Sequence, residues 1–219
     1  MARFHNRRDA GRSLGALLRT YASVHPLVLG LPRGGVPVAF EVARALDAQL
    51  DIFVVRKLGV PGHEELAMGA VASGGAVVMN DDVVAQAGVS RAEIERILAM
   101  ETREIQRRET LYRAGGNPPA IAGHHVILVD DGIATGASML VAVQALRAHG
   151  PRSITVAVPV ASRAALMALR NHADDWACVM TPEPFHGVGA WYDDFSQTTD
   201  AEVRELLARA PSENHLVPR

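Results

Sequence analysis

The chain has 219 residues, of which 48% are hydrophobic and 21% charged, so it is long enough for one α/β domain. A formal net charge of −2 gives no overall basic field, which argues against general binding to nucleic acids or membranes. The single cysteine, Cys178, excludes a disulfide framework, and no apolar run reaches the roughly 18 residues of a membrane span. We therefore expect a cytoplasmic protein with a single domain over residues 1–212.

The first predicted elements are a helix and a strand that ends in a glycine-rich turn. Residues 6–23 have the spacing of an amphipathic helix, with leucines on one face and arginines, including Arg7, on solvated faces. Residues 26–30 form a short buried strand. Because glycine lets the backbone approach an anion and a guanidinium suits phosphate oxygens, the next turn is a candidate anion site: Pro32, Arg33, Gly34 and Gly35. A plain tight turn is the alternative.

A second apolar run, residues 50–55, is predicted to be a parallel strand that ends in Arg56 and Lys57. Lys57 is the only lysine among 22 basic residues. The carboxyl ends of such strands are where open α/β sheets bind ligands, and pyrophosphate is the natural counterion for this pair. The following segment combines turn formers with His63, Glu64 and Glu65, which predicts a mobile loop on a β-hairpin.

A long charged helix is predicted over residues 90–113. Ser90 and Glu93 form a capping box at its start, and Glu104 and Arg108 are spaced for an i,i+4 ion pair. Its apolar stripe is narrow, so the helix should cross the surface. The linker at residues 115–119 separates it from the next strand.

The most informative stretch is residues 126–138. Four apolar residues predict a buried parallel strand, and Asp130 and Asp131 follow at its carboxyl end. Beside a phosphate these carboxylates would suit sugar hydroxyls or a hydrated magnesium ion. The small residues that open the next helix could direct their N–H groups at that phosphate: Ala134, Thr135, Gly136, Ala137 and Ser138. The alternative is an ordinary turn with an aspartate capping the helix.

The remaining strands and helices alternate, which predicts a doubly wound parallel sheet of the α/β class. Strands are expected at residues 153–158 and 176–180, with a helix at residues 163–170 between them. Residues 181–198 are rich in proline, glycine and aromatic residues and match no regular element, and a helix is expected at residues 200–209. We treat residues 213–219 as a tail, because residues 216–219 (Leu-Val-Pro-Arg) resemble a thrombin-site remnant.

Residues 126–138 resemble the phosphoribosyl-diphosphate (PRPP) binding motif of type I phosphoribosyltransferases, with four apolar residues, two acids and a loop ending in Thr-Gly and Ser. The wider likeness, to a bacterial subfamily of these proteins, runs from Phe4 to Arg209. It implies their Rossmann-like fold with a flexible hairpin loop. It also implies that Asp130 and Asp131 hold the ribose 2′ and 3′ hydroxyls and that residues 134–138 wrap the 5′-phosphate.

The same resemblance implies further roles. The turn at residues 32–35 would bind pyrophosphate and carry a cis peptide between Pro32 and Arg33, and Arg56 and Lys57 resemble the pair that begins the flexible loop of adenine-type enzymes. His63, Glu64 or Glu65 would move a proton as that loop closes. Residues 181–198 resemble the small hood of hypoxanthine and guanine transferases, with these acceptor residues: Phe185, Trp191 and Asp193. Magnesium would be held mainly by the substrate, with Asp130, Asp131 and Asp193 as candidate ligands.

We thus expect a pentosyltransferase of nucleotide metabolism, a homodimer, that uses PRPP, Mg²⁺ and a small nitrogenous acceptor. Arg33, Lys57 and the two aspartates would be its catalytic residues. Ala134 favours an adenine-type acceptor over hypoxanthine or guanine, whereas the hood favours the reverse, so the base stays open. A regulator that keeps the PRPP pocket as a sensor is the second reading. A Rossmann nucleotide-binding protein or methyltransferase is the third, disfavoured because no Gly-x-Gly-x-x-Gly opens the loop.

Overall fold

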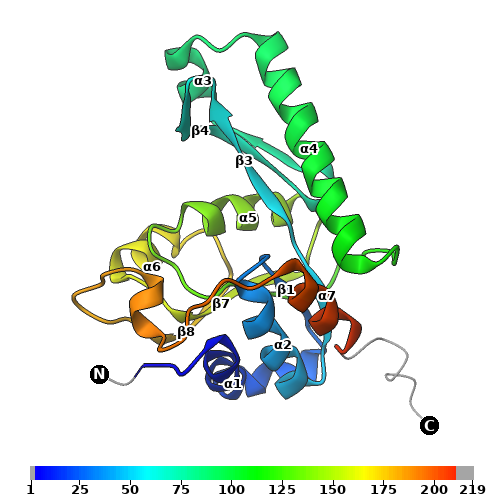
Figure 1. Ribbon diagram of the computed structural model, residues 1–219, viewed down its shortest axis with the longest axis vertical. Helices are drawn as coiled ribbons and strands as arrows, with labels where there is room; N and C mark the ends of the chain where they lie inside the picture. The colour runs from blue at the N-terminus through cyan, green and yellow to red at the C-terminus, as the bar shows by residue number, and fades with distance from the viewer. Residues whose placement is uncertain (1–2, 211–219) are drawn as a thin grey trace.

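The computed structural model of the protein describes residues 3–210, and the expected tail at residues 213–219 lies outside them. Its centre is a parallel sheet (Figure 1). The sheet has five strands in the order β2-β1-β6-β7-β8. The strands are β1 Leu27–Gly30, β2 Gln49–Ile52, β6 His125–Val129, β7 Ser153–Val160 and β8 Asp175–Met180. Almost all residues of β1 and β6 are buried, and most of them are β-branched or leucine, as expected for a sheet covered on both faces.

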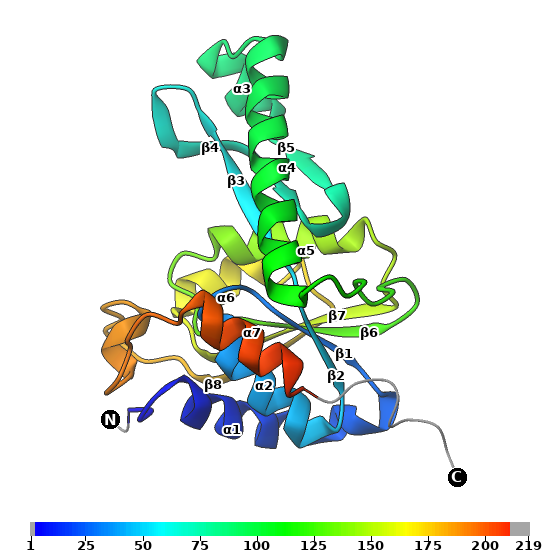
Figure 2. The ribbon, with the colours of Figure 1, turned by 45° about the vertical axis from the view of Figure 1, so that its right-hand side comes forward.

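Helices cover both faces of this sheet (Figure 2). On one face Val28, Ile127 and Val129 pack in a cluster with residues of the helices α1 Arg7–Leu17, α2 Gly35–Leu46 and α7 Asp200–Ala208. On the other, Leu29 and Leu128 pack with residues of α5 Ala137–Arg147 and α6 Arg163–Leu169. Alternate strand residues thus enter opposite clusters, because successive side chains of a strand point to opposite faces. The predicted doubly wound fold is confirmed.

Two predicted boundaries differ from the structure. The helix expected over residues 6–23 ends at Leu17 and is followed by a 3₁₀ helix, Arg19–Val24. The strand expected over residues 50–55 ends at Ile52, and a separate antiparallel strand begins at Val55. Phe53 and Val54 between them are both 1% exposed, so burial continues where the sheet ends. An apolar run in the sequence predicts that its residues are buried, but it does not predict to which sheet they belong.

A second unit, here called the arm, comprises residues 55–113 and projects from the sheet (Figure 1). It contains the antiparallel strands β3 Val55–Val60, β4 His63–Ala72 and β5 Val77–Met79, a short 3₁₀ helix at Ser73–Gly75, and the helices α3 Asp81–Ala87 and α4 Arg91–Arg113. The predicted hairpin, the capping box and the Glu104–Arg108 pair at 2.7 Å are confirmed. The helix α3 was not predicted, although Asn80 caps its start and Gly88 ends it.

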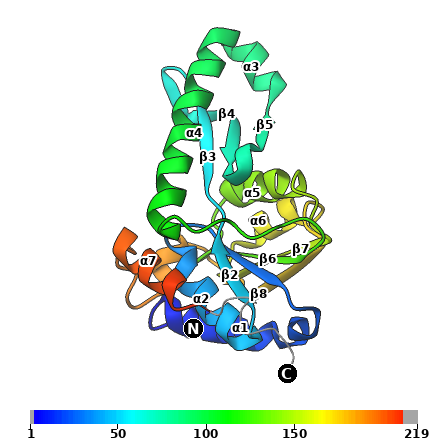
Figure 3. The ribbon, with the colours of Figure 1, turned by 90° about the vertical axis from the view of Figure 1, so that its right-hand side faces the viewer.

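The base of the arm is tied to the sheet by polar contacts. The N–H of Val54 donates to Ser73 Oγ at 2.9 Å, and the N–H of Ser73 donates to Val54 O at 2.8 Å. Arg113, at the end of α4, pairs with Asp51 of β2 at 2.9 Å. The foot of α4 also lies beside α7 (Figure 3). Among residues 3–210, no helix combines the length and the apolar character needed to cross a membrane.

Candidate functional site

Two loops meet at the carboxyl edge of the sheet: residues 31–34 after β1 and residues 130–136 after β6. A Cβ atom at Gly34 would overlap Asp131 Oδ2, and one at Gly35 would lie 2.7 Å from Val129 O. Only glycine therefore lets the turn after β1 pack against the acidic pair. The peptide bond between Pro32 and Arg33 is cis, as the resemblance implied. The structure thus brings the candidate anion turn and the two aspartates together.

Each aspartate is anchored through one carboxylate oxygen and leaves the other open. Asp130 Oδ1 accepts the N–H of Asp131 at 2.8 Å, and Asp131 Oδ2 accepts Nε of Arg7 at 2.8 Å. Asp130 Oδ2 and Asp131 Oδ1 have no hydrogen-bond partner among residues 3–210, yet neither is a buried, unsatisfied atom. They therefore reach solvent. The pair is not sealed away in salt bridges and offers two acceptor oxygens to a ligand.

Burial also sets the electrostatics of the pair. It raises the pKa of Asp130 well above the usual value, and the charge of Asp131 adds to the shift. The pKa of Asp131 is raised by burial too, while Arg7 opposes the shift. Two carboxylates held so close are costly when ionised unless a cation or a hydrogen-bond donor comes to them.

Arg7 was expected on a solvated helix face, and that expectation is wrong. Its side chain is only 11% exposed, because the first turn of α1 lies against the acidic pair. One terminal nitrogen of Arg7 donates to Ser196 O at 2.6 Å, and the guanidinium carbon lies 4.0 Å from the centre of the Phe195 ring. Tyr192 donates its hydroxyl to Asp131 O at 2.6 Å. No sequence signal identified these residues, since their partners are distant in the chain.

The predicted phosphate loop opens the helix α5. Ala134, Thr135, Ala137 and Ser138 are exposed, and Gly136 adopts φ +85°, a left-handed conformation that suits glycine. A Cβ at Gly136 would also lie 2.7 Å from Leu169 Cδ1. Ser162 Oγ donates to Ala134 O at 2.6 Å, which ties the loop to the N-cap of α6. The exposed first turn of an eleven-residue helix is suited to an anion.

Arg33 lies in the predicted turn after β1, whereas the other two predicted cations lie elsewhere than expected. Arg56 and Lys57 lie inside β3, on the arm, and do not end a parallel strand. Arg56 Nε pairs with Glu101 of α4 at 2.6 Å, and Lys57 Nζ lies 3.7 Å from Glu65. Arg33 pairs with Asp200 at 3.7 Å, at the start of α7. Each cation therefore already has an acidic partner at its own position.

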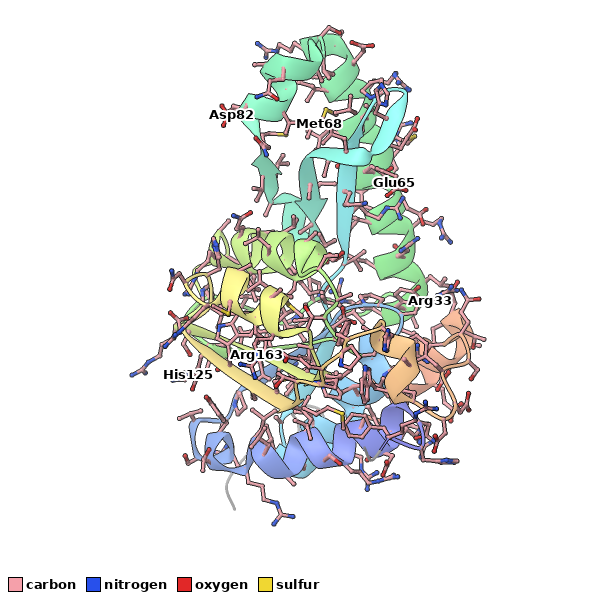
Figure 4. The ribbon with its side chains drawn as sticks, turned by 90° about the vertical axis from the view of Figure 1, so that its left-hand side faces the viewer. Arg33, Glu65, Met68, Asp82, His125 and Arg163 are labelled. Atoms are coloured by element: carbon pink, nitrogen blue, oxygen red, sulfur yellow. The ribbon has the colours of Figure 1, made fainter. Side chains whose placement is uncertain are left out.

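A cleft of about 580 Å³ joins the arm to the phosphate loop. Lys57, Glu64 and Glu65 line it from the hairpin, and Ser138 lines it from α5. His63, Glu64 and Glu65 are exposed, next to the turn at Pro61 and Gly62. In Figure 4, Glu65 on the arm and Arg33 on the body lie on the same side, whereas His125 lies on the opposite side.

The hood, residues 181–198, packs against the N-terminal segment and the end of β7. Phe185 and Trp191 are partly buried against a cluster of Phe4, Val160 and Tyr192, so their rings already have packing partners. Val188 packs over Gly132, where a Cβ would clash with it, and this contact brings the hood to the acidic loop. Asp193 is exposed. Within the described part of the chain, no three histidine, cysteine or acidic residues are grouped to hold a metal, so Asp193 does not join the acidic pair in such a cluster.

The chain is similar to known proteins in both sequence and structure. The model of the phosphoribosyl transferase domain family matches residues 6–189. Two curated relatives from Mycobacterium tuberculosis, strains CDC 1551 and H37Rv, carry a provisional phosphoribosyl transferase name; each is 44% identical over 210 residues, covering 96% of this chain and 47% of the relative. The chain spans about half the length of these relatives. A crystal structure from Thermus thermophilus is 41% identical, with a TM-score of 0.85, and covers 96% of this chain and 100% of that chain.

Proposed function

The chain belongs to the phosphoribosyl transferase domain family, and from that premise we propose that it binds PRPP with Mg²⁺ and transfers the phosphoribosyl group to a nitrogenous acceptor, releasing pyrophosphate. One observation carries the proposal. Asp130 and Asp131 each present a free carboxylate oxygen beside the exposed loop at residues 134–138 and the turn at residues 32–35. A phosphorylated sugar with two adjacent hydroxyls and a diphosphate has groups complementary to the acidic pair, the loop and the turn.

In this proposal the protein acts by positioning and by charge. Asp130 Oδ2 and Asp131 Oδ1 accept hydrogen bonds from the ribose hydroxyls, and the first turn of α5 holds the 5′-phosphate. Arg33 and Lys57 exchange their present partners, Asp200 and Glu65, for oxygens of the diphosphate. Both ion pairs are solvent-exposed and therefore weak, so the exchange costs little. Departure of pyrophosphate leaves a cationic sugar, which the two carboxylates stabilise.

The acidic pair also fits a magnesium ion. Carboxylate oxygens that reach solvent suit a hydrated Mg²⁺ bound mostly by water and substrate, and Asp130 and Asp131 would supply them. Bound to the diphosphate, the ion neutralises charge on the leaving group. Asp193 is less suited, because it does not group with the pair.

We assign the acceptor to the hood, next to Phe185, Trp191 and Asp193. Support comes from Val188, which brings this segment against Gly132 in the acidic loop. Ala134 has no side chain that could take a proton from the acceptor, so His63, Glu64 and Glu65 on the hairpin are the candidate bases. A purine is one candidate acceptor among nitrogen heterocycles. A pyrophosphate-release screen across purines, pyrimidines and other nitrogen nucleophiles would identify the acceptor.

The test of the binding site is calorimetric titration of PRPP with Mg²⁺ into the wild type and the variants Asp130→Asn and Asp131→Asn. Loss of one charge-assisted hydrogen bond should weaken PRPP binding by about 10- to 100-fold, while thermal unfolding stays cooperative. Unchanged affinity in both variants would refute the ribose assignment.

A PRPP sensor is the second candidate, and one feature favours it: Asp131, Arg33 and Lys57 all have charged partners already. A sensor would bind PRPP in the calorimeter and release no pyrophosphate with any acceptor in the screen. Pyrophosphate release with one acceptor class would decide the question in favour of the enzyme.

A further inference from the structure

Arg7 connects three parts of the molecule that meet at the acidic pair. It lies in the first turn of α1, its Nε donates to Asp131 Oδ2 at 2.8 Å, and a terminal nitrogen donates to Ser196 O at 2.6 Å. Its guanidinium stacks on Phe195. The Phe195 ring in turn lies 5.1 Å from that of Tyr192, whose hydroxyl donates to Asp131 O. Arg7 and Tyr192 thus both donate to Asp131, and the Phe195 ring contacts both of these side chains.

The Arg7 guanidinium also lies close to the turn after β1. The Cβ position of Gly34 lies 3.3 Å from Arg7 Nε, so the guanidinium sits where that turn and Asp131 touch. With Asp131 Oδ2 held by Arg7, the carboxylate cannot rotate freely, and Oδ1 is the oxygen that faces a ligand. Without Arg7, either oxygen could turn toward the ribose, and the side chain would lose rotational freedom only on binding.

We propose that Arg7 is a positioning residue of the ribose site, which fixes the Asp131 carboxylate so that Oδ1 meets a sugar hydroxyl and which couples this orientation to the hood, through Phe195 and Ser196. The proposal rests on the proposed function, because it needs a ribose at the acidic pair. The guanidinium suits the role because its planar fork donates in two fixed directions at once, here to Asp131 and to Ser196 O.

A purely structural role predicts something different. If Arg7 only joined α1 to the hood, its loss would lower stability and weaken the binding of all ligands of the site alike. A positioning role changes the preference for sugars that carry hydroxyl groups. The measurement is therefore a ratio: the affinity for ribose 5-phosphate divided by the affinity for 2,3-dideoxyribose 5-phosphate, which has the same phosphate and lacks both hydroxyls.

The variants are Arg7→Met and Arg7→Lys, with Arg8→Met as the matched control. Arg8 is the next residue of the same helix turn, and its guanidinium lies 5.9 Å from the Phe40 ring, away from the acidic pair. The affinity ratio should fall roughly tenfold in Arg7→Met, as expected for one hydrogen bond that is no longer preorganised. Arg7→Lys should give an intermediate ratio, because one ammonium cannot make both contacts, and Arg8→Met should keep the wild-type ratio.

The outcomes separate the two proposals. A wild type that does not prefer ribose 5-phosphate overturns the ribose site and with it the role of Arg7. A wild type with a clear preference that both Arg7 variants retain overturns only the role of Arg7. Circular dichroism of each variant shows that it is folded, and if Arg7→Met fails to fold, the ratio in Arg7→Lys decides: a fall supports the positioning role and a wild-type ratio refutes it.

Discussion

At the scale of single residues, the acidic pair shows how ligand binding and stability make opposite demands. Asp130 is partly buried beside a second carboxylate, and its pKa is raised by burial and by the charge of Asp131. A buried carboxylate without a partner lowers the stability of the folded protein. A ligand that donates hydrogen bonds to both acids, or a cation, recovers that cost. Residues with strongly shifted pKa values in such a position are typical of functional sites.

The variant Asp130→Asn should therefore gain stability while it loses affinity for PRPP. A carboxyl group whose pKa is higher in the folded state contributes its full stability below the unfolded pKa and loses it as the pH rises through the folded pKa. The asparagine variant has no such loss. We expect its melting temperature near pH 7, with a chelator present, to exceed that of the wild type by roughly 2–4 °C, the shift that about 1 kcal/mol gives at this chain length. The gain should shrink near pH 4, and a less stable variant at neutral pH would contradict it.

At the scale of elements, α4 supports the hairpin along its length. Ile97 and Ile105 of α4 are buried in the same cluster as Leu58 and Met68 of the hairpin. Arg56 pairs with Glu101 at 2.6 Å, and Glu101 is only 9% exposed. The hairpin that carries Lys57 is therefore supported on one side by a long helix. Any movement of the hairpin away from α4 would have to break this contact.

Replacing Glu101 by Gln should loosen the hairpin without unfolding the arm. Removing the charge weakens a partly buried ion pair by about 1 kcal/mol, so amide hydrogen exchange at residues 56–65 should speed up about fivefold. The control is Glu95→Gln on the same helix, whose partner Arg91 is 92% exposed and whose pair should contribute little. Equal exchange rates in both variants would show that the Arg56–Glu101 pair does not restrain the hairpin.

At the scale of the whole molecule, the arm and the sheet meet through the pair of Asp51 and Arg113. Both side chains are only 9% exposed, and Arg113 also donates to Ile52 O at 3.2 Å. Burial raises the pKa of Asp51, and Arg113 opposes that shift. Since Asp51 belongs to β2 and Arg113 ends α4, this contact sets how the arm stands on the sheet. The cleft between the hairpin and the phosphate loop depends on that placement.

Replacing Arg113 by Met should destabilise the protein by about 3–5 kcal/mol near pH 8, because it leaves Asp51 buried without its cation. With Arg113 gone, the pKa of Asp51 rises further, so the stability lost is greatest above that pKa and is partly recovered near pH 5, where the carboxyl takes up a proton. Denaturant unfolding at both pH values measures this. Arg107→Met is the control, since its side chain is 60% exposed and should change stability little. An equal loss at both pH values would exclude an uncompensated charge as the cause.

The sequence alone predicted the parts of the molecule that depend on local pattern. The parallel strands β1 and β6, the small-residue loop at residues 134–138, the capping box of α4 and the α/β class all follow from periodicity and from residue types a few positions apart. Asp130 and Asp131 were identified in the same way, because a pair of acids at the end of a buried strand is a local signal.

Only the tertiary structure showed what these parts touch. Arg7 and Asp131 are 124 residues apart, and their ion pair has no local signature. The end of β2 at Ile52 could not be predicted from the sequence, because Phe53 and Val54 stay buried as the chain passes from one sheet to the next. The sequence placed Arg56 and Lys57 at the end of a parallel strand, whereas the chain has already left that sheet at Ile52 and carries both residues into the arm. Hydrophobic periodicity reports whether a residue is buried, whereas the identity of its neighbour depends on the folded chain as a whole.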